Sequence, residues 1–328
     1  MTTRGALVRL LADGQLHSGE ELAARLAISR AAVWKQLQLP EDWSIDLQAL
    51  RGRGYRLHEP LDLLDAGAIR AALPQWAAGR LRNLEVHEEL ASTSDRLLAV
   101  ADLPAGRFDA CLAEFQSAGR GRRGRRWLAP YASGLCLSVN RRFDDAPAAL
   151  GALSLAIGVA VLRALRGLHI RGLALKWPND IMHGRRKLGG ILVDLRGEAA
   201  GAAYIVVGAG VNVRLQEWLR ANLRAEGVEA TGLDELLDAP PSRNALAALL
   251  VNEIALALEE FSARGLDAFV DEWRSADGLM DRPIRVQQGA ETVEGLARGI
   301  DADGALLLDV RGVGRRILSG NVTIRALG

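Results

Sequence analysis

The most constraining feature of the sequence is the stretch GRGRRGRRW, residues 119–127, which holds five arginines and three glycines in nine positions. Apolar segments typical of buried β-strands, DACLAEFQ and LCLSVNRR, precede and follow it. No acidic residue occurs between Phe115 and Phe143, so the neighbouring sequence cannot neutralise these arginines. Because adjacent guanidinium groups repel one another, we expect a loop between two strands that folds around an anion with several charged oxygens.

The stretch matches other glycine-rich or arginine-rich motifs in its residue types but not in the structure that those motifs require. GRGRRG has the spacing of a dinucleotide-binding turn, and Asp144 follows about 20 residues later. That turn must open a helix, whereas Pro130 and Gly134 lead into another strand. A P-loop needs lysine and then serine or threonine after Gly124, where two arginines stand. A disordered arginine-glycine tail would not be flanked by strands.

Composition limits the class of protein. The 328 residues exceed what one core usually organises, so we expect two or three domains. The net charge of +1 restricts the binding of polyanions to local patches. The longest apolar run, residues 148–162, is too short for a membrane span, and Arg9 argues against a secretion signal. Cys111 and Cys136 lie far apart in apolar runs, as in a reduced cytoplasmic protein, and we expect neither a disulfide nor a metal site.

Residues 1–60 have the pattern of a winged helix-turn-helix domain. Apolar residues recur at helical spacing in three segments, and Ser18 and Ser29 stand where N-caps would begin the second and third. Pro40 ends the third segment, and the alternating stretch SIDLQALRGRGYRL then predicts a hairpin wing. The pattern therefore predicts a DNA-binding unit whose recognition helix begins at Ser29.

The basic residues of this unit gather where DNA phosphates would be met. Residues 1–60 contain eight Lys and Arg against seven Asp and Glu, so the unit as a whole is nearly neutral. The recognition helix and the wing nevertheless concentrate its cations. We predict DNA contacts by Ser29, Arg30, Lys35, Arg51 and Arg53.

Beyond Pro60 the chain alternates strand-like and helix-like segments, which is typical of an α/β domain. The apolar run 148–162 predicts a buried helix, and residues 244–269 predict amphipathic helices. Towards the C-terminus the segments are short strands separated by Gly and Asp turns, which predicts a small β-barrel. We therefore expect an α/β (α+β) multidomain protein with domains at 1–60, 61–276 and 277–328.

Three segments of the middle domain complement the arginine loop. KWPND, residues 176–180, places a lysine and two polar side chains at an expected strand end, where α/β sheets bind ligands. KLGG, residues 187–190, sets a lysine beside glycines that let a ligand approach the backbone. GAGVN, residues 208–212, ends a buried strand with an amide able to read the edge of a heterocycle. Each is weak alone, but together with the arginine loop they predict one ligand site.

The ordered set STS, EFQSAGRGRRGRRW, KWPNDI, KLGGILVD and VGAGVNV, behind a helix-turn-helix, resembles the bifunctional biotin-protein ligases and biotin-operon repressors of bacteria. The resemblance covers essentially the whole chain. It implies a winged helix-turn-helix, a central class II synthetase-like mixed sheet with helices, and an SH3-like C-terminal barrel. It also implies that biotin carboxylate attacks the α-phosphate of ATP, with Mg²⁺ present. The resulting biotinyl-AMP passes its biotin to a lysine of biotin carboxyl carrier protein. Bound to the adenylate, a homodimer would occupy the biotin operator.

The resemblance also implies roles for individual residues. Biotin or its activated carboxylate would contact Ser92, Thr93, Ser94, Gln116, Arg120, Gly121, Arg122 and Lys187. The reaction would depend on Arg120, Arg122, Lys176, Asp180 and Lys187. ATP or the adenylate would contact Trp127, Asn179, Asn212 and Arg325. Our own hypothesis adds Trp218, in the segment after Asn212, as apolar cover for the adenine; the alternative is a partly buried helix residue. No protein side chain is identified as a metal ligand.

Two departures and two alternatives qualify this interpretation. The family's Ser-Thr-Asn is Ser92-Thr93-Ser94 here, which puts the contact of the third position in doubt but leaves a hydroxyl. Gly189 replaces the usual alanine of the Lys-Leu-x-Gly motif, which only loosens the backbone. A lipoate-protein ligase shares the adenylate chemistry but resembles this arginine loop less and normally lacks a DNA-binding domain. A ligand-sensing transcription factor with an inactive enzyme domain is the other alternative, and the intact lysines and arginines argue against it.

Overall fold

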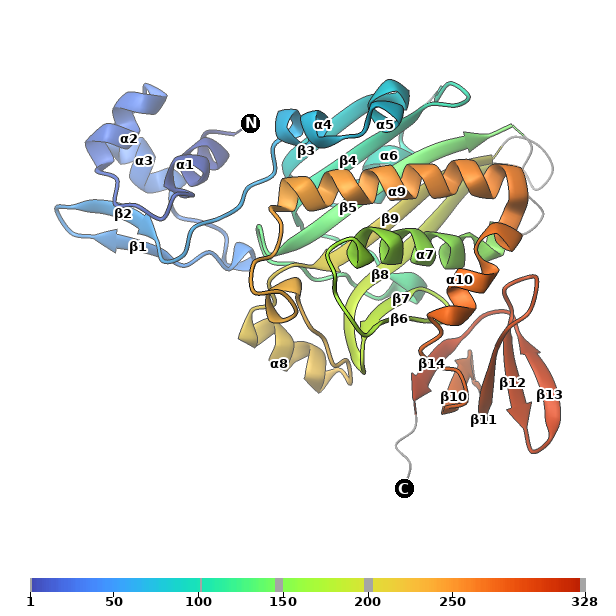
Figure 1. The fold of residues 1–328 in the computed structure, drawn as a ribbon. Coiled ribbons are helices and arrows are strands. Elements are labelled where there is room, and N and C mark those ends of the chain that lie inside the picture. Colours follow the sequence, from blue (N-terminus) through green and yellow to red (C-terminus); the bar gives the residue numbers. More distant parts are fainter. Residues whose placement is uncertain (1, 101, 145–149, 198–202, 325–328) are drawn as a thin grey trace.

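The computed structural model describes residues 2–100, 102–144, 150–197 and 203–324. Three units, each with its own β-sheet, follow one another along the chain (Figure 1). The first contains a two-stranded sheet, the second a seven-stranded sheet, and the third a five-stranded sheet. The mixed α/β multidomain class expected from the sequence is confirmed. We propose domain boundaries near residues 60 and 276, where the chain passes from one unit to the next.

The N-terminal unit consists of three short helices and a hairpin, α1 (Thr3–Leu11), α2 (Gly19–Leu26), α3 (Arg30–Gln36), β1 (Leu47–Leu50) and β2 (Gly54–Leu57). The hydroxyls of Ser18 and Ser29 accept hydrogen bonds from the backbone N–H groups of the first turns of α2 and α3, as the sequence predicts. Leu7, Leu22 and Val33 are fully buried and form the core between the helices. A 3₁₀ turn, η1 (Glu41–Trp43), connects α3 to the hairpin.

The central sheet has the strand order β3 (Leu81–Leu90), β4 (Phe108–Gln116), β5 (Gly134–Phe143), β9 (Ala203–Asn212), β8 (Arg186–Gly197), β7 (Asp180–His183) and β6 (Leu173–Lys176). Only β3 and β4 run parallel, and the other neighbouring pairs are antiparallel. Period-two alternation divides β5 between two environments. Leu135, Leu137 and Val139 enter the main core, whereas Cys136 and Ser138 belong to the opposite face.

Two long helices, α7 (Leu153–Arg166) and α9 (Arg243–Arg264), lie side by side over one face of this sheet (Figure 1). The helix predicted from the apolar run 148–162 is therefore present, but it begins at Leu153 and extends to Arg166. Residues 148 and 149 lie outside the described residues. The opposite face of the sheet carries the short helix α6 (Thr93–Leu98). The remaining helical elements are α4 (Ala66–Ala72), α5 (Gln75–Arg80), α8 (Glu217–Ala225), α10 (Val270–Ser275), η2 (Arg122–Gly124), η3 (Leu150–Ala152), η4 (Leu233–Glu235) and η5 (Gly265–Ala268).

The C-terminal unit is an antiparallel sheet of strand order β13 (Val313–Ile317), β12 (Leu306–Val310), β11 (Glu291–Ile300), β10 (Pro283–Gln288) and β14 (Asn321–Ile324). Ile284, Val286 and Leu308 are buried and belong to the same apolar cluster as the central domain. The indole Nε1 of Trp177 donates a hydrogen bond to the carbonyl of Gly304 at 3.0 Å, which ties this unit to the central domain. Among the described residues, no helix combines the length and apolarity needed to cross a bilayer.

A buried ion pair joins the linker, the sheet and the long helix. The side chains of Arg243, at the start of α9, and Glu114, on β4, are each 3% exposed, and Arg243 Nη1 lies 2.7 Å from Glu114 Oε2. The guanidinium also donates to the carbonyls of Asp62 and Gly134, at 2.7 Å through Nη1 and Nη2 respectively. Glu114 Oε1 accepts from the N–H of Leu64. The pair is therefore hydrogen-bonded on both sides, as burial of charge requires.

Removing one partner of this pair leaves the other charge buried without compensation. We expect Arg243→Ala to lower the free energy of unfolding by about 3 to 5 kcal/mol. Urea denaturation followed by circular dichroism measures the loss. The control is Arg264→Ala, because Arg264 is 64% exposed in an i,i+4 pair with Glu260, and its loss should cost less than about 1 kcal/mol. Equal stability of the two variants would contradict a structural role for the pair.

Candidate functional site

The arginine loop connects β4 to β5 and is closed by its own backbone. The N–H of Gly121 donates to the carbonyl of Arg125 at 2.7 Å, and the N–H of Trp127 donates to that of Gly119 at 2.9 Å. Arg123 has a φ of 56° and Gly124 a φ of 73°, so the turn occupies the left-handed region twice in succession. The sequence prediction of a loop between two strands is confirmed.

Acidic side chains from elsewhere in the chain neutralise part of this loop. Arg120 Nη2 lies 2.7 Å from Asp194 Oδ2 on β8 and 2.8 Å from Asp95 Oδ1 on α6. The expectation that all five arginines stand unneutralised is therefore wrong for Arg120. Sequence neighbours could not reveal this pairing, because Asp194 is 74 residues away. An anionic ligand would have to compete with these carboxylates for the guanidinium.

The other arginines spread outward from the loop. Arg122 Nη1 donates to Asn179 Oδ1 at 3.4 Å, and burial lowers the pKa of Arg122, with the charge of Arg123 adding to the effect. Arg123 Nη1 donates to the carbonyl of Gln287 on β10 at 3.2 Å, so the loop reaches the C-terminal unit. Arg126 Nη2 donates to the carbonyl of Ser117. Arg122 thus lies at the first lysine motif, through its contact with Asn179.

The two lysine motifs meet at one carboxylate. Lys187 Nζ lies 2.6 Å from Asp180 Oδ1, and Lys176 Nζ lies 3.8 Å from Asp180 Oδ2. Burial lowers the pKa of Lys176, and the nearby positive charges of Lys187 and Arg125 act in the same direction. Two lysines and Arg122 therefore surround a single acid, which is an arrangement able to neutralise a phosphate.

The setting of residues 176–180 differs from the one expected. They form the turn of the antiparallel hairpin β6–β7, rather than the carboxyl end of a strand in a parallel sheet. Asn179 is held in this turn by its side-chain Nδ2, which donates to the carbonyl of Ile191 at 2.8 Å. The residues still lie at the site, because β7 pairs directly with the start of β8, which carries Lys187.

Glycines of β8 and β9 provide a flat floor for the indole of Trp127. A Cβ added to Gly210 would fall within the Trp127 ring, and one added to Gly190 would lie 3.5 Å from it. Lys187 Nζ lies 5.9 Å from the centroid of the same ring. The Trp127 Nε1 is buried and makes no hydrogen bond of normal geometry among the described residues. Burial raises the pKa of the neighbouring Cys136 to about 11, and Trp127 is one of the groups that oppose this rise. The glycines of the two motifs are therefore required for close approach.

A cluster of buried polar side chains lies where α6 meets the sheet. Gln116 Oε1 accepts from the backbone N–H of Thr93 at 2.8 Å and from the Thr93 hydroxyl at 3.1 Å. Ser138 Oγ lies 2.8 Å from Thr93 Oγ1 and 3.0 Å from Ser94 Oγ. Ser92 caps α6, since its Oγ accepts from the N–H of Asp95. The hydroxyl of Ser94, in doubt from the sequence, has a defined partner in Ser138, which sequence reasoning missed.

The residues predicted to contact the nucleotide do not share one setting in the structure. Asn212 is buried, and its Nδ2 donates to the carbonyl of Thr231 at 3.1 Å, so the amide holds neighbouring backbone. Trp218 is 46% exposed on α8, and its Nε1 donates to Gln216 Oε1. It lines a groove of about 880 Å³ between the N-terminal unit and the central domain. Arg325 lies outside the described residues.

The predicted DNA-contacting residues are exposed as a group. Arg30 and Lys35 are exposed on α3, and Arg51 and Arg53 are exposed in the turn of the wing. Arg30 Nη1 makes an exposed ion pair with Glu20 at 3.1 Å. Ser29 has a capping role, because its hydroxyl accepts from the N–H of Ala32. Sequence reasoning missed Trp34, whose large apolar side chain is 59% exposed on α3.

The groove beside Trp218 shows how the N-terminal unit is attached. The rings of Trp43 and Tyr131 stack at 4.5 Å between centroids. Tyr131 follows the arginine loop in sequence, and Arg214, which precedes α8, forms an ion pair with Glu59. The N-terminal unit therefore contacts two segments of the central domain, the one that follows the arginine loop and the one that follows β9.

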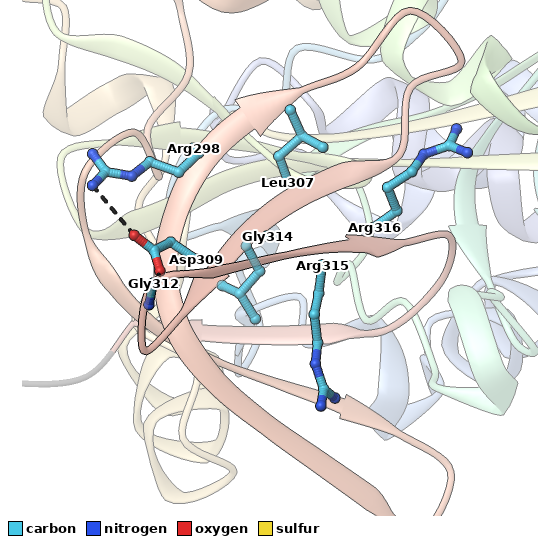
Figure 2. Close-up of a pocket in the computed structure, with 8 residues that line it drawn as sticks. Arg298, Leu307, Asp309, Gly312, Gly314, Arg315 and Arg316 are labelled. Atoms are coloured by element: carbon cyan, nitrogen blue, oxygen red, sulfur yellow. Dashed lines mark hydrogen bonds and ion pairs between the residues drawn. The ribbon is translucent and has the colours of Figure 1, made fainter.

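A second cleft, of about 450 Å³, lies on the C-terminal sheet (Figure 2). Arg298, Asp309, Arg315 and Arg316 line it. Arg298 pairs with Asp309 at 3.6 Å, and Arg316 pairs with Asp301 at 2.5 Å. Because its charges are already compensated and none of the sequence motifs reaches it, this cleft is not the main candidate site.

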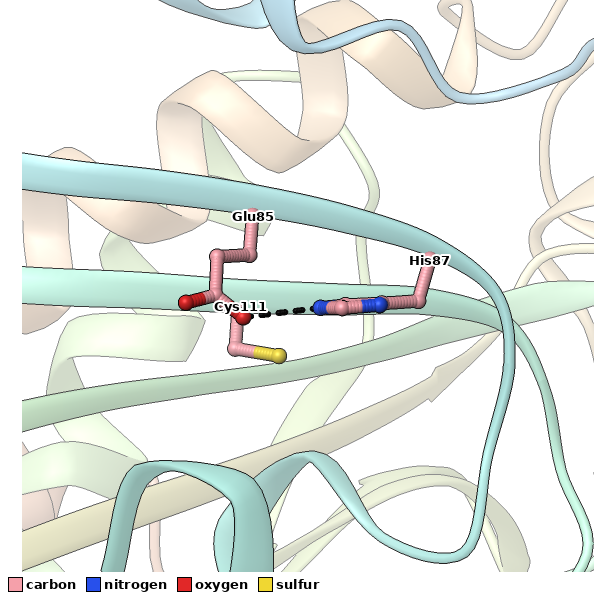
Figure 3. Close-up of side chains that lie close together, drawn as sticks. All are labelled: Glu85, His87 and Cys111. Atoms are coloured by element: carbon pink, nitrogen blue, oxygen red, sulfur yellow. Dashed lines mark hydrogen bonds and ion pairs between the residues drawn. The ribbon is translucent and has the colours of Figure 1, made fainter. Parts of the chain in front are cut away.

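Glu85, His87 and Cys111 form a third cluster, on β3 and β4 (Figure 3). Their ligand atoms lie within 4.8 Å of one another, a proximity that sequence spacing did not reveal. The carboxylate of Glu85 is already bound by both Nε and Nη2 of Arg96, each at 2.8 Å, and by His87 Nε2 at 2.8 Å. Burial raises the pKa of Cys111 to about 12, which disfavours the thiolate that a metal requires. The contacts are those of a structural ion-pair network.

Comparison with known proteins agrees with this geometry. Residues 93–212 match the Biotin/lipoate A/B protein ligase family, residues 4–56 match an HTH domain, and residues 280–325 match the Biotin protein ligase C terminal domain. The chain is 40% identical over 321 residues to the Bifunctional ligase/repressor BirA of Salmonella typhimurium, covering 98% of this chain and 97% of the relative. It is also 40% identical to BirA of Escherichia coli, over 98% of this chain and 96% of the relative.

Solved structures give the same result. The biotin protein ligase of Aquifex aeolicus in complex with biotin and ATP superposes with a TM-score of 0.60 at 26% identity, covering 74% of this chain and 99% of that one. The arginine loop, the lysine motifs and, apart from Ser92, the polar cluster fall within the matched ligase region of residues 93–212. With a relative of this similarity over nearly its whole length, the chain belongs to the BirA family of bifunctional ligase/repressors.

Proposed function

We propose that this protein is an ATP-dependent biotin-protein ligase that forms biotinyl-5'-AMP and transfers biotin to a lysine of biotin carboxyl carrier protein. The observation that carries the proposal is the pairing of Lys176 and Lys187 with Asp180, with Arg122 beside them on Asn179. The polar cluster of Thr93 and Gln116 supplies the second part of the site. The first group is suited to phosphate and the second to the polar ring of biotin. We place the reaction in the cytoplasm, where ATP and carrier protein are available.

In the first step, a biotin carboxylate oxygen forms a bond to the α-phosphorus of ATP, and the bond from that phosphorus to the bridging oxygen of pyrophosphate breaks. In the second step, the carrier lysine attacks the biotin carbonyl and AMP leaves. Negative charge accumulates on phosphate and carbonyl oxygens in both steps, so fixed cations supply most of the catalysis. We assign this role to Arg120, Arg122, Lys176 and Lys187.

The remaining residues have supporting roles in the proposal. Asp180 holds the two lysines in place, and Mg²⁺ bound to the ATP phosphates would neutralise part of their charge. Ser92, Thr93, Ser94, Gln116 and Gly121 contact biotin, while Trp127, Asn179, Asn212 and Trp218 surround the nucleotide. Arg325, outside the described residues, is proposed as a further nucleotide contact. The glycine floor under Trp127 supports a flat ligand near this indole.

A lipoate-protein ligase is the alternative substrate class, because the matched family includes both activities by name. Two findings favour biotin. Residues 280–325 match the Biotin protein ligase C terminal domain, and the similar ligase of Aquifex aeolicus was solved in complex with biotin and ATP. Incubation with ATP, a carrier domain and radiolabelled biotin or lipoate distinguishes the two ligases. Absence of transfer with either acid would indicate a regulator with an inactive ligase domain.

Loss of a fixed cation should slow formation of the adenylate. We expect Lys187→Ala and Arg120→Ala each to lower the single-turnover rate of biotinyl-AMP formation. The expected loss of transition-state stabilisation is about 2 to 4 kcal/mol. The matched control is Arg264→Ala, an exposed arginine on α9 outside the site. Thermal unfolding of all three variants should remain near that of the wild type. Rates within threefold of the wild type for both site variants would refute the assignment.

We propose that DNA is contacted by α3 and the wing, through Arg30, Lys35, Arg51 and Arg53 around the capped start of α3 at Ser29. Each cation that touches a phosphate releases a counterion, so binding should weaken as salt rises. In Lys35→Ala and Arg53→Ala we expect the slope of log affinity against log salt to become shallower by roughly one unit each. Titration of a mixed-sequence duplex by fluorescence anisotropy measures the slopes, with Arg264→Ala as control. Unchanged slopes in both variants would place the DNA contacts elsewhere.

We also propose that the adenylate promotes a homodimer that represses the biotin operon, and that β8 supplies the interface. From Leu192 to Gly197 this strand pairs only with β9 among the described residues, so its outer edge is open. Leu195 on this edge is 55% exposed. Asp194, also on this stretch, holds Arg120, which links the arginine loop to the edge. A ligand that rearranges the loop can therefore change how two copies pair.

The dimer should be linked to the adenylate by mutual stabilisation. Sedimentation equilibrium should show stronger self-association when biotinyl-AMP is added, and operator binding should strengthen in parallel. Leu195→Asp should abolish the ligand-dependent association, because it places a charge in the apolar interface. The matched control is Val313→Asp, since Val313 is 63% exposed on the edge strand of the C-terminal sheet. An association constant indifferent to the adenylate would mean that the ligase lacks this switch.

A further inference from the structure

A chain of buried hydroxyls lies beneath the pocket proposed for biotin. Ser138, on β5, is 0% exposed and therefore cannot touch a ligand in this arrangement. Its Oγ nevertheless lies within hydrogen-bond distance of two residues proposed to contact biotin, 2.8 Å from Thr93 Oγ1 and 3.0 Å from Ser94 Oγ. Thr93 in turn contacts Gln116. Four side chains thus form one connected network from α6, β4 and β5.

Gln116, at one end of this network, determines the direction of every hydrogen bond in it. The backbone N–H of Thr93 lies 2.8 Å from the Gln116 side chain, and a backbone N–H can only donate, so the atom facing it is the carbonyl Oε1. The Thr93 hydroxyl lies 3.1 Å from the same oxygen and must donate its single proton to it. Thr93 Oγ1 can therefore only accept from the Ser138 hydroxyl. Because the Ser138 proton is donated to Thr93, Ser138 Oγ accepts from the Ser94 hydroxyl.

This order decides what the pocket can offer to a ligand. Gln116 Oε1 is occupied by two donors, so the side chain can donate only through Nε2. One side of this amide faces the Cys136 thiol, and its second N–H is left for a ligand. Nε2 lies 3.2 Å from where a Cβ of Gly119 would stand, at the start of the arginine loop. Ser94 has given its proton to Ser138, so its free lone pairs can only accept. Ser94 Oγ lies 2.8 Å from the position of a Cβ on Gly208, whose bare backbone leaves room there.

We propose that Ser138 is a positioning residue that sets the polarity of biotin recognition through this ordered chain. The cyclic urea of biotin has one carbonyl that accepts and two ring N–H groups that donate. In the orientation that brings the urea carbonyl to Gln116 Nε2 and a ring N–H to Ser94 Oγ, the glutamine donor and the serine acceptor complement the ring, and the reversed polarity would not. The inference rests on the proposed function, because it assumes that biotin occupies the pocket above Thr93 and Gln116. Ser138 acts without contact with the ligand, by holding the protons of its neighbours in one order.

The test separates recognition of biotin from the rest of the reaction. In Ser138→Ala we expect the KM for biotin to rise by roughly tenfold, since the variant leaves buried hydroxyls without partners. The KM for ATP and the rate of transfer from saturating biotinyl-AMP should stay within twofold of the wild type. The control is Ser133→Ala, a buried serine just before β5 whose hydroxyl donates to the carbonyl of Pro130. It should leave all three quantities unchanged.

A second readout reports the proton order itself. Two cyclic carbamate isosteres of biotin replace one or the other ring N–H with oxygen, an acceptor. The wild type should reject the isostere whose oxygen faces Ser94, because two acceptors then oppose each other. In Ser138→Ala the Ser94 proton is released and can donate, so discrimination between biotin and that isostere should narrow by roughly fivefold to tenfold. If Ser138 had only a structural role, the substitution would weaken the binding of biotin and of both isosteres to the same extent.

The outcomes distinguish this inference from the proposed function. If Ser138→Ala unfolds, Ser138→Cys keeps a weak donor of similar volume and should show the same changes at smaller size. An unchanged KM for biotin, or unchanged discrimination, with Lys187→Ala still impaired would overturn the role of Ser138 and leave the ligase assignment standing. Failure of the wild type to form biotinyl-AMP would overturn both.

Discussion

The structure depends on one constraint, which is that β5, β8 and β9 must present opposite chemistry on their two faces. Alternate residues of β5 enter the apolar core with α7 and α9, and the intervening residues face the site. On β9 the same alternation leaves Gly208 and Gly210 on the site face, where a side chain would collide with Ser94 or Trp127. A shift of one residue in strand pairing would exchange the two faces and destroy both core and site.

On this scaffold the site is assembled by opposing charges. Asp194 and Asp95 hold Arg120, and Asp180 holds Lys187, so the cations are kept in place without leaving them unpaired. These are partly exposed pairs, which hold little net energy in water. A phosphate or carboxylate can therefore displace them at modest cost. The same pairs connect the arginine loop to β8, and so give the loop a route to the open strand edge.

The three units also share contacts that a list of domains would not suggest. Arg243 and Glu114 fasten the linker after the DNA-binding unit to the strand that leads into the arginine loop. Trp43 stacks on Tyr131, which follows that loop, and Arg123 reaches β10 of the C-terminal unit. The arginine loop thus lies between segments that contact both terminal units. These contacts connect the arginine loop physically to both terminal units.

The sequence by itself determined the elements and the chemistry of the site. Caps at Ser18 and Ser29, the strands around residues 119–127, and the cationic motifs all follow from local patterns, because capping, alternation and charge are properties of neighbouring residues. Only the tertiary structure decided the partners. Asp194 for Arg120, Asp180 for Lys187 and Ser138 for Thr93 and Ser94 are brought together by strand order and register. These pairings depend on which strands are neighbours in the sheet, and a chain read residue by residue carries no direct signal of contacts between segments so far apart.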